Sequence, residues 1–509
     1  MDPQRRIIVN TSAQYVKAVV NILLSLYATR LVLHELNIHD YGIYSLIAGV
    51  VGILGYLTNA LVVTTQRYLS FYQGSGDFEK VREFFYTSLF IHIALSVLFF
   101  AALLLFEGFI IDSSLTLPAE RISAAHIVYL ATTAMLLISV ISSPFKAMLI
   151  SHENIVFLSI VELADAIMKL FLALLLAIIT TDKLEFYAYG MSIVILINLL
   201  AYIIYTYRNY EESRYKKNQA LISRQSVSQL LGFASWTLYG MVAGVCQTQG
   251  TAILLNRFFG TALNAAFGLA TQVNGAIRFV STSIINAMNP QIMKAEGNDN
   301  RTRMLELASK ESKFSTAMMA IISIPIIVEM PSILDFWLEE IPSSTALLCR
   351  AMMIAFLIDQ LTLGLHAANQ ATGKIRNYSI LMFTPKILYV PAAWLILYIS
   401  NSVTAIMALF VIIEFTVALC RIPYIHYTAG LNMSDYFQKT ILPVIPLFLV
   451  SYASSLAFSY LADFPFRFVF TFAISTIISL LVMWAVVLDN NEKQYIQKQI
   501  QMILSRCGR

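Results

Sequence analysis

Long apolar runs, separated by short polar turns, fill almost the whole sequence. A helix needs about 20 residues to cross the hydrocarbon core of a bilayer, and runs of this length recur along the chain. Transmembrane β-barrels show shorter, alternating segments instead. The pattern predicts an all-α polytopic membrane protein with about fourteen transmembrane helices. The predicted spans are near residues 7–33, 41–66, 87–111, 122–143, 155–180, 185–207, 229–256, 262–289, 314–334, 344–370, 378–399, 402–426, 439–461 and 465–488.

The first span carries a polar stripe in an otherwise apolar helix. Its members, three or four residues apart and therefore on one narrow arc of a helix, are Asn10, Gln14, Lys17, Asn21 and Ser25. An ionisable side chain at membrane depth costs roughly 2.5–3.5 kcal/mol on insertion scales, so it marks a functional face by default. The stripe predicts that this face lines a water-filled cavity.

The span at 262–289 repeats the arrangement. Its polar arc consists of Asn264, Gly268, Thr271, Gly275, Arg278, Thr282, Asn286 and Asn289. Two interpretations are open: a cavity wall that binds substrate, or hydrogen bonding between packed helices. For Lys17 and Arg278, each at mid-span, we favour the cavity. Arg30 and Arg257 lie at span ends, where they either snorkel to the interface or receive an anionic headgroup.

Further charges lie inside other spans. The span at 155–180 holds Glu162, Asp165 and Lys169, of which the last two are spaced for a local ion pair. Asp359 and His366, both in the span at 344–370, suit either a proton relay or a packing cluster.

Two spans near the C-terminal end also carry single charges. Glu414 and Lys386, in neighbouring spans, either pair with each other or line the cavity. Glu414 therefore joins Asp359 and His366 as a candidate for ion or proton coupling.

The spans fall into two halves that resemble a repeat. The motif Tyr41-Gly42-Ile43-Tyr44 and a polar loop at 73–77 have counterparts at 266–269 and 296–299. Two six-span halves insert with the same orientation, and a substrate site lies between such repeats. The predicted domains are two pseudo-symmetric six-helix lobes (1–207 and 229–426), a cytoplasmic linker (208–228), two additional helices (427–488) and a cytoplasmic tail (489–509).

The distribution of basic residues predicts how the chain is oriented across the membrane. Most Lys and Arg outside the spans fall on one side of the alternating topology, and the exceptions are Arg121, Lys183, Arg257 and Arg467. The positive-inside rule then places both termini in the cytoplasm.

Composition supports the membrane assignment and excludes several functions. Charged residues make up 13% of the chain, against about 25% in soluble domains. A net charge of +4 gives no indication of nucleic-acid binding. The sequence has no Walker A motif, no His-Glu-x-x-His motif and no paired-Cys metal site, so we expect no cofactor and no metal. Loops between spans are too short for an extramembrane catalytic domain, which argues against an enzyme.

Three short strings and the overall plan resemble a known family. The strings are Thr29-Arg30-Leu31-Val32-Leu33, Asp40-Tyr41-Gly42-Ile43-Tyr44 and Thr65-Gln66-Arg67-Tyr68. The chain is similar over its whole length to the multidrug/oligosaccharidyl-lipid/polysaccharide (MOP) flippase superfamily, and within it to bacterial O-antigen and capsule flippases.

This resemblance implies flipping of a polyprenyl-diphosphate-linked oligosaccharide from the cytoplasmic to the periplasmic leaflet for surface polysaccharide synthesis. It implies a bacterial inner-membrane transporter with alternating access, which works with the bilayer and with polysaccharide assembly proteins. The last two spans resemble helices that form a lipid-tail groove in a related branch. The alternative is a multidrug or small-molecule antiporter of the same superfamily, coupled to cations through Asp359 and His366. Span 1 carries Lys17 and no acid, which argues against a cationic drug.

Overall fold

Helices account for all the regular secondary structure in the part of the chain that the computed structural model describes. It describes residues 3–52, 55–109, 111, 119–215, 222–337, 344–461, 466–494 and 497. The chain divides into two compact units, Met1–Met241 with Asn286–Asn300, and Val242–Ile285 with Arg301–Arg509.

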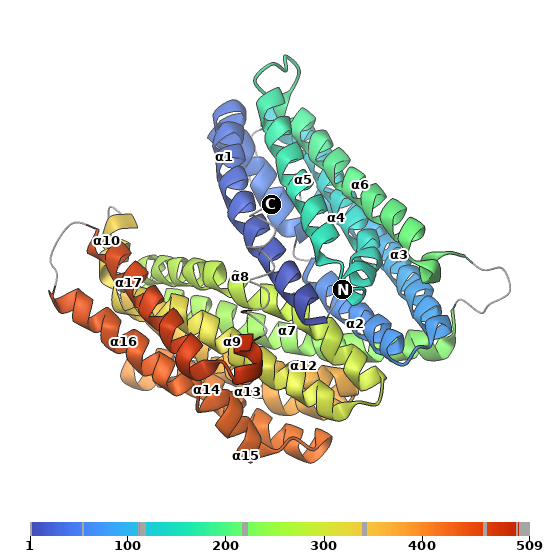
Figure 1. The fold of residues 1–509 in the computed structure, drawn as a ribbon. Helices are drawn as coiled ribbons and strands as arrows, with labels where there is room; N and C mark the ends of the chain where they lie inside the picture. The colour runs from blue at the N-terminus through green and yellow to red at the C-terminus, as the bar shows by residue number, and fades with distance from the viewer. Residues whose placement is uncertain are drawn as a thin grey trace, which may run out of the picture. The chain divides into compact units, whose positions relative to one another are not determined.

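Unit 1 is built around a long, kinked first helix. Asn37, at φ 64° and ψ 164°, interrupts α1 and turns the chain into its second arm. α1 packs against α4, α5 and α6, while α2 packs against α3 and α4 (Figure 1). Its elements are α1 (Pro3–Gly52), α2 (Gly55–Gly74), α3 (Phe78–Gly108), η2 (Ala119–Arg121), α4 (Ile122–Ser151), α5 (Ile155–Leu175), α6 (Lys183–Asn209) and η3 (Glu211–Ser213).

Helices α7 (Arg224–Phe259) and α8 (Thr261–Gly297) contribute to both units. In unit 2, α9 packs against α11, α12, α16 and α17. The remaining elements are α9 (Arg301–Val328), α10 (Met330–Trp337), α11 (Thr345–Gln360), α12 (Leu363–Thr372), α13 (Ile375–Ser400), α14 (Val403–Ala429), α15 (Met433–Tyr436), η4 (Phe437–Ile441), α16 (Val444–Leu461), α17 (Arg467–Val482) and η5 (Met483–Val487).

Local capping explains where several helices begin and end. The carboxylate of Asp182 accepts hydrogen bonds from the backbone N–H groups of Leu184 and Glu185 and so starts α6. Asn154 starts α5 in the same way through the N–H of Phe157. Gly430 follows α14 with φ +79°, a left-handed conformation that glycine adopts without a steric penalty.

Nine described helices are long and apolar enough to span a membrane, and the bent pair α11–α12 makes a tenth. Helices also occupy the other predicted ranges, but α5 holds three charged residues within 21 positions and so differs from the apolar spans. The count of fourteen spans therefore stays a prediction. The span predicted as continuous over 344–370 is instead two helices bent by 48°.

Two glycines make reciprocal close contacts at the ends of α2 and α8. A Cβ on Gly74 would stand 2.1 Å from the carbonyl oxygen of Lys294, and one on Gly297 would stand 1.9 Å from that of Phe71. Gly74 thus faces Lys294, three positions before Gly297, and Gly297 faces Phe71, three positions before Gly74. Gly74 and Gly297 belong to the two loops that the sequence aligned as a repeat, so the ends of α2 and α8 are equivalent partners in this contact.

Candidate functional site

The polar stripe of α1 meets an acidic partner on α5. The ammonium of Lys17 lies 2.5 Å from Glu162 Oε2 and donates to Gln14 Oε1 at 3.1 Å. Gln14 is buried and Asn21 is half-buried. The side chain of Asn10 lies outside the described residues. Lys17 is therefore one half of an ion pair between helices, and the sequence analysis had not identified Glu162 as its partner.

Three more charged side chains complete this group. Lys169 and Asp165 form the predicted i,i+4 pair at 2.7 Å, and Asn198 of α6 donates to Asp165 at 2.7 Å. Lys146 of α4 interacts electrostatically with Glu162 and Asp165, and its Nζ lies 5.5 Å from the ring centroid of Tyr202. We call Lys17, Lys146, Glu162, Asp165 and Lys169 the N-terminal cluster.

Lys146 lies on a longer helix than the sequence predicted. It follows the predicted end of the span at 122–143, but α4 continues to Ser151. The basic side chain consequently lies half-buried among the charges of the N-terminal cluster.

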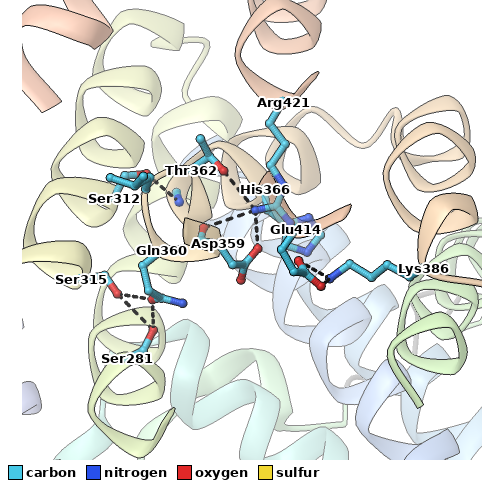
Figure 2. A network of polar contacts seen from close by, with 12 residues as sticks. Ser281, Ser312, Ser315, Asp359, Gln360, Thr362, His366, Lys386, Glu414 and Arg421 are labelled. Atoms are coloured by element: carbon cyan, nitrogen blue, oxygen red, sulfur yellow. Dashed lines mark hydrogen bonds and ion pairs between the residues drawn. The ribbon is translucent and has the colours of Figure 1, made fainter. Parts of the chain in front are cut away.

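A second cluster occupies the break between α11 and α12. Arg421 of α14 donates from Nη1 to Asp359 Oδ1 at 2.7 Å and to Thr362 Oγ1 at 3.2 Å (Figure 2). Lys386 of α13 lies 2.7 Å from Glu414 of α14, so these residues pair, which is one of the two possibilities that the sequence left open. Arg278 of α8 stacks over the ring of Phe356 at 4.7 Å and interacts electrostatically with Asp359. We call Arg278, Asp359, Lys386, Glu414 and Arg421 the C-terminal cluster.

Hydrogen bonds hold the helices around this cluster together. Gln360 Oε1 accepts from Ser281 of α8 at 2.5 Å and from Ser315 of α9 at 2.6 Å, as Figure 2 shows. His366 of α12 shares hydrogen bonds with Tyr378 at 3.2 Å and with Gln370 at 3.0 Å. Both nitrogens of the His366 ring are thus already engaged within the protein.

Arg421 is a cluster residue to which the sequence analysis gave no role. It lies in the predicted span at 402–426, and its side chain is 4% exposed and paired with Asp359. The relevant signal was present, because Arg421 and Glu414 lie seven residues apart on one helix and so share a face. Which acid each base meets could be decided only by the packing of α11 and α13 against α14.

The other predicted site residues lie on exposed or partly exposed positions. Arg30 and Arg257 are exposed near the ends of their helices, and Asn286 is half-buried in α8. On the predicted polar arc of α8, Gly275, Arg278 and Thr282 are all exposed. No carboxylate among the described residues pairs with Arg278, in contrast to Lys17.

The two clusters share one arrangement. Each contains two ion pairs and one further cation that lies over an aromatic ring: Lys146 over Tyr202, and Arg278 over Phe356. An aromatic face attracts a cation and holds it without neutralising its charge. Each cluster as defined therefore carries one more positive than negative charge, and this surplus favours an anionic ligand.

A separate apolar cavity lies in unit 2. It has a volume of about 250 Å³ and lies where α9 and α10 face α17. Its lining residues are Pro325, Ile326, Ile333, Phe468, Val469 and Phe472. Such a lining suits a hydrocarbon chain.

Comparison with solved structures shows the fold. A MATE transporter in its bent conformation matches at a TM-score of 0.73 and 14% identity, over 87% of this chain and 98% of that chain. An outward-facing multidrug resistance MATE transporter of the MOP superfamily matches at 0.70 and 14%, over 86% and 97%. A MOP superfamily transporter from Pyrococcus furiosus, described as having a binding pocket of reverse polarity, matches at 0.68 and 16%, over 86% and 97%.

These identities are low, and the likeness establishes a shared MATE-type fold. Neither a protein-family model nor a curated protein sequence matches the chain at a significant level.

Proposed function

We propose that this protein is a membrane transporter that flips a polyprenyl-diphosphate-linked oligosaccharide from the cytoplasmic to the periplasmic leaflet by alternating access. The fold is that of membrane transporters, which supports transport and argues against an enzyme. In this proposal the chain resides in a bacterial inner membrane with both termini in the cytoplasm.

The surplus positive charge of the two clusters carries the proposal. Every acid of the N-terminal and C-terminal clusters has a basic partner within 2.8 Å, whereas Lys146 and Arg278 lie over aromatic rings and form no ion pair with a described residue. A cationic drug would meet acids that are already neutralised. An anionic diphosphate would meet cations that remain available, and an arginine can bind two of its oxygens at once.

The remaining parts of the substrate match other features of the chain. Amide side chains on the polar arcs, such as Asn21 and Asn286, can bond sugar hydroxyls. The apolar cavity beside α17 offers a place for part of the polyprenyl chain. Arg30 and Arg257, both exposed, are proposed to meet the diphosphate near the outer face.

The proposal is tested by reconstitution with a defined substrate. Proteoliposomes carry a synthetic polyprenyl-diphosphate-linked oligosaccharide, and an impermeant glycosidase reports how fast the glycan crosses the bilayer. We expect Arg278→Gln to lower the rate about tenfold or more, because one hydrogen-bonded charge contributes about 1.5–3 kcal/mol. The matched control is Arg224→Gln, an exposed arginine at the start of α7 outside both clusters.

Two outcomes would overturn the proposal. Absence of glycan transport by the wild-type protein removes the substrate class. Full activity of the Arg278→Gln protein removes the role of the surplus cation.

A second candidate is a cation-coupled antiporter of multidrugs or small molecules. The observation in its favour is the fold shared with a multidrug resistance transporter, together with Asp359 and His366 at a helix break. If ethidium moves across the proteoliposome membrane, and Asp359→Asn abolishes this movement while glycan is not transported, the antiporter is the correct assignment.

A further inference from the structure

A carboxylic acid outside both clusters is buried without a partner. Glu311 lies in α9, is 1% exposed, and neither of its carboxyl oxygens accepts a hydrogen bond from the described residues. Asp and Glu are almost never fully buried unless they are paired. The sequence analysis had placed Glu311 just before the span at 314–334 and had assigned it no role.

The charged groups around α9 are already engaged elsewhere. The elements packed against α9 are α10, α11, α12, α16, α17 and η4, and its own turns carry two lysines and, near its start, Arg301 and Arg303. The pairs that occupy charged groups here are Arg303 and Lys310 with Glu306, Lys313 with Glu492, Arg467 with Glu329, Asp359 with Arg421, and Lys439 with Asp435.

The other titratable groups of these elements also leave Glu311 without a cation. His366 is bonded to Tyr378 and Gln370, and Arg350 donates to the carbonyls of Ile327 and Val328. Tyr436 interacts electrostatically with Glu311, but its hydroxyl donates to the carbonyl of Leu361 at 2.7 Å. The remaining titratable side chains, Asp335, Tyr452 and Tyr460, are exposed, and Cys349 is a thiol.

Close packing keeps water away from this part of α9. A Cβ on Gly364 of α12 would stand 1.9 Å from the carbonyl oxygen of Ala308, one turn before Glu311. The N–H of Gly364 donates to Ser312 Oγ at 2.9 Å, so α9 and α12 approach each other almost backbone to backbone (Figure 2). An ionised carboxylate in such a dry, unpaired position costs far more than a neutral one, and the group takes up a proton instead.

We propose that Glu311 is a proton-binding site of this transporter: it holds a proton while α9 and α12 are packed together and releases it to water when they separate. A role of Glu311 in coupling proton movement to transport rests on the proposed transport function, whereas the presence of a bound proton does not. The step is reversible, with one proton taken up by the carboxylate or returned to water. Asp359 and Glu414 differ from Glu311 in having basic partners, Arg421 and Lys386.

Infrared spectroscopy of the purified protein at neutral pH tests the bound proton. Protonated carboxyl groups have a carbonyl stretching band that ionised carboxylates lack. We expect this band in the wild type, its loss in Glu311→Gln, and its retention in Glu329→Gln. Glu329 is the matched control because it is equally buried, at 2% exposure, but paired with Arg467.

The carbonyl stretching band tests whether Glu311 is protonated without the use of any transport substrate. A spectrum of folded Glu311→Gln that still contains the full band would overturn the proposal. Gln is nearly isosteric with a protonated Glu, so we expect the thermal midpoint of this variant to stay close to that of the wild type. A large drop in that midpoint would instead indicate an ionised, paired Glu311 and would also overturn the proposal.

A transport assay under a pH gradient tests whether Glu311 couples proton movement to transport. In the glycan assay, we expect a pH gradient to change the wild-type rate and to leave the Glu311→Gln rate unchanged. Equal responses of the two proteins, or no response of an active wild type, would remove Glu311 from coupling. If the wild type moves no glycan at all, the proposed substrate fails while the infrared result still decides the proton site.

Discussion

At the scale of single residues, charges inside the helices are organised by pairs that the sequence does not reveal. Lys17 meets Glu162, which lies 145 positions away in the chain. The sequence analysis had paired Asp165 with Lys169 and had given Glu162 no partner. The structure confirms the Asp165–Lys169 pair and shows that Glu162 pairs with Lys17.

The Lys17–Glu162 pair makes a prediction for stability. Lys17→Met leaves Glu162 partly buried without its cation, which we expect to destabilise the protein by about 2 kcal/mol. Adding Glu162→Gln removes the unpaired charge and should recover part of this loss. The measurement is the thermal midpoint in detergent for both single variants and the double variant.

Strict additivity would contradict this prediction. If the double variant loses as much as the two single variants together, the two residues do not interact, because coupled residues give non-additive changes in free energy.

At the scale of elements, close helix contacts depend on glycine at a few positions. Gly74→Ala and Gly297→Ala each insert a methyl group within 2.1 Å of a carbonyl oxygen of the other helix. Both changes should destabilise the protein by about 1–3 kcal/mol, since the backbones must move apart. We expect similar losses from the two variants because their contacts are reciprocal. Thermal unfolding of each variant measures the effect.

The control for these variants is another glycine of α8. A Cβ on Gly268 would meet no atom within 4 Å, so Gly268→Ala should stabilise the helix slightly, by up to about 1 kcal/mol. A loss of stability in Gly268→Ala as large as in Gly297→Ala would contradict the prediction, because it would show that a methyl group on α8 destabilises the protein without a close contact to α2.

At the scale of the whole molecule, ion pairs outside the spans hold helices together within each unit. Arg121, just before α4, donates to Asp40 at the bend region of α1 and to Asp182 at the start of α6. Burial raises the pKa of Asp182, but the hydrogen bonds from Arg121 and from backbone N–H groups outweigh it and hold the pKa below its ordinary value. Three helices of unit 1 therefore share one cation.

This lowered pKa predicts how stability depends on pH. The contribution of Asp182 is fully present above the ordinary pKa of an aspartate, about 4. It is lost as the pH falls through the lower pKa of the folded state. We expect Arg121→Gln to lower the thermal midpoint at neutral pH, and the difference from the wild type to shrink below about pH 4. A difference independent of pH would contradict this origin.

The sequence by itself determined the class of fold, the positions of most helices and the presence of charges inside them. Hydrophobic runs and capping residues can be recognised from neighbouring residues in the sequence. The free energy of inserting an apolar segment into a bilayer likewise depends mainly on the residues of that segment. The i,i+4 pair of Asp165 and Lys169 was likewise predictable because both residues lie on one helix. The tertiary structure alone decided which distant charges meet: Lys17 with Glu162, Arg421 with Asp359, and Glu311 with no cation among the described residues. Helix packing sets these partners, and whether a charge inside a span is neutralised, available to a ligand or protonated depends on the partner it meets.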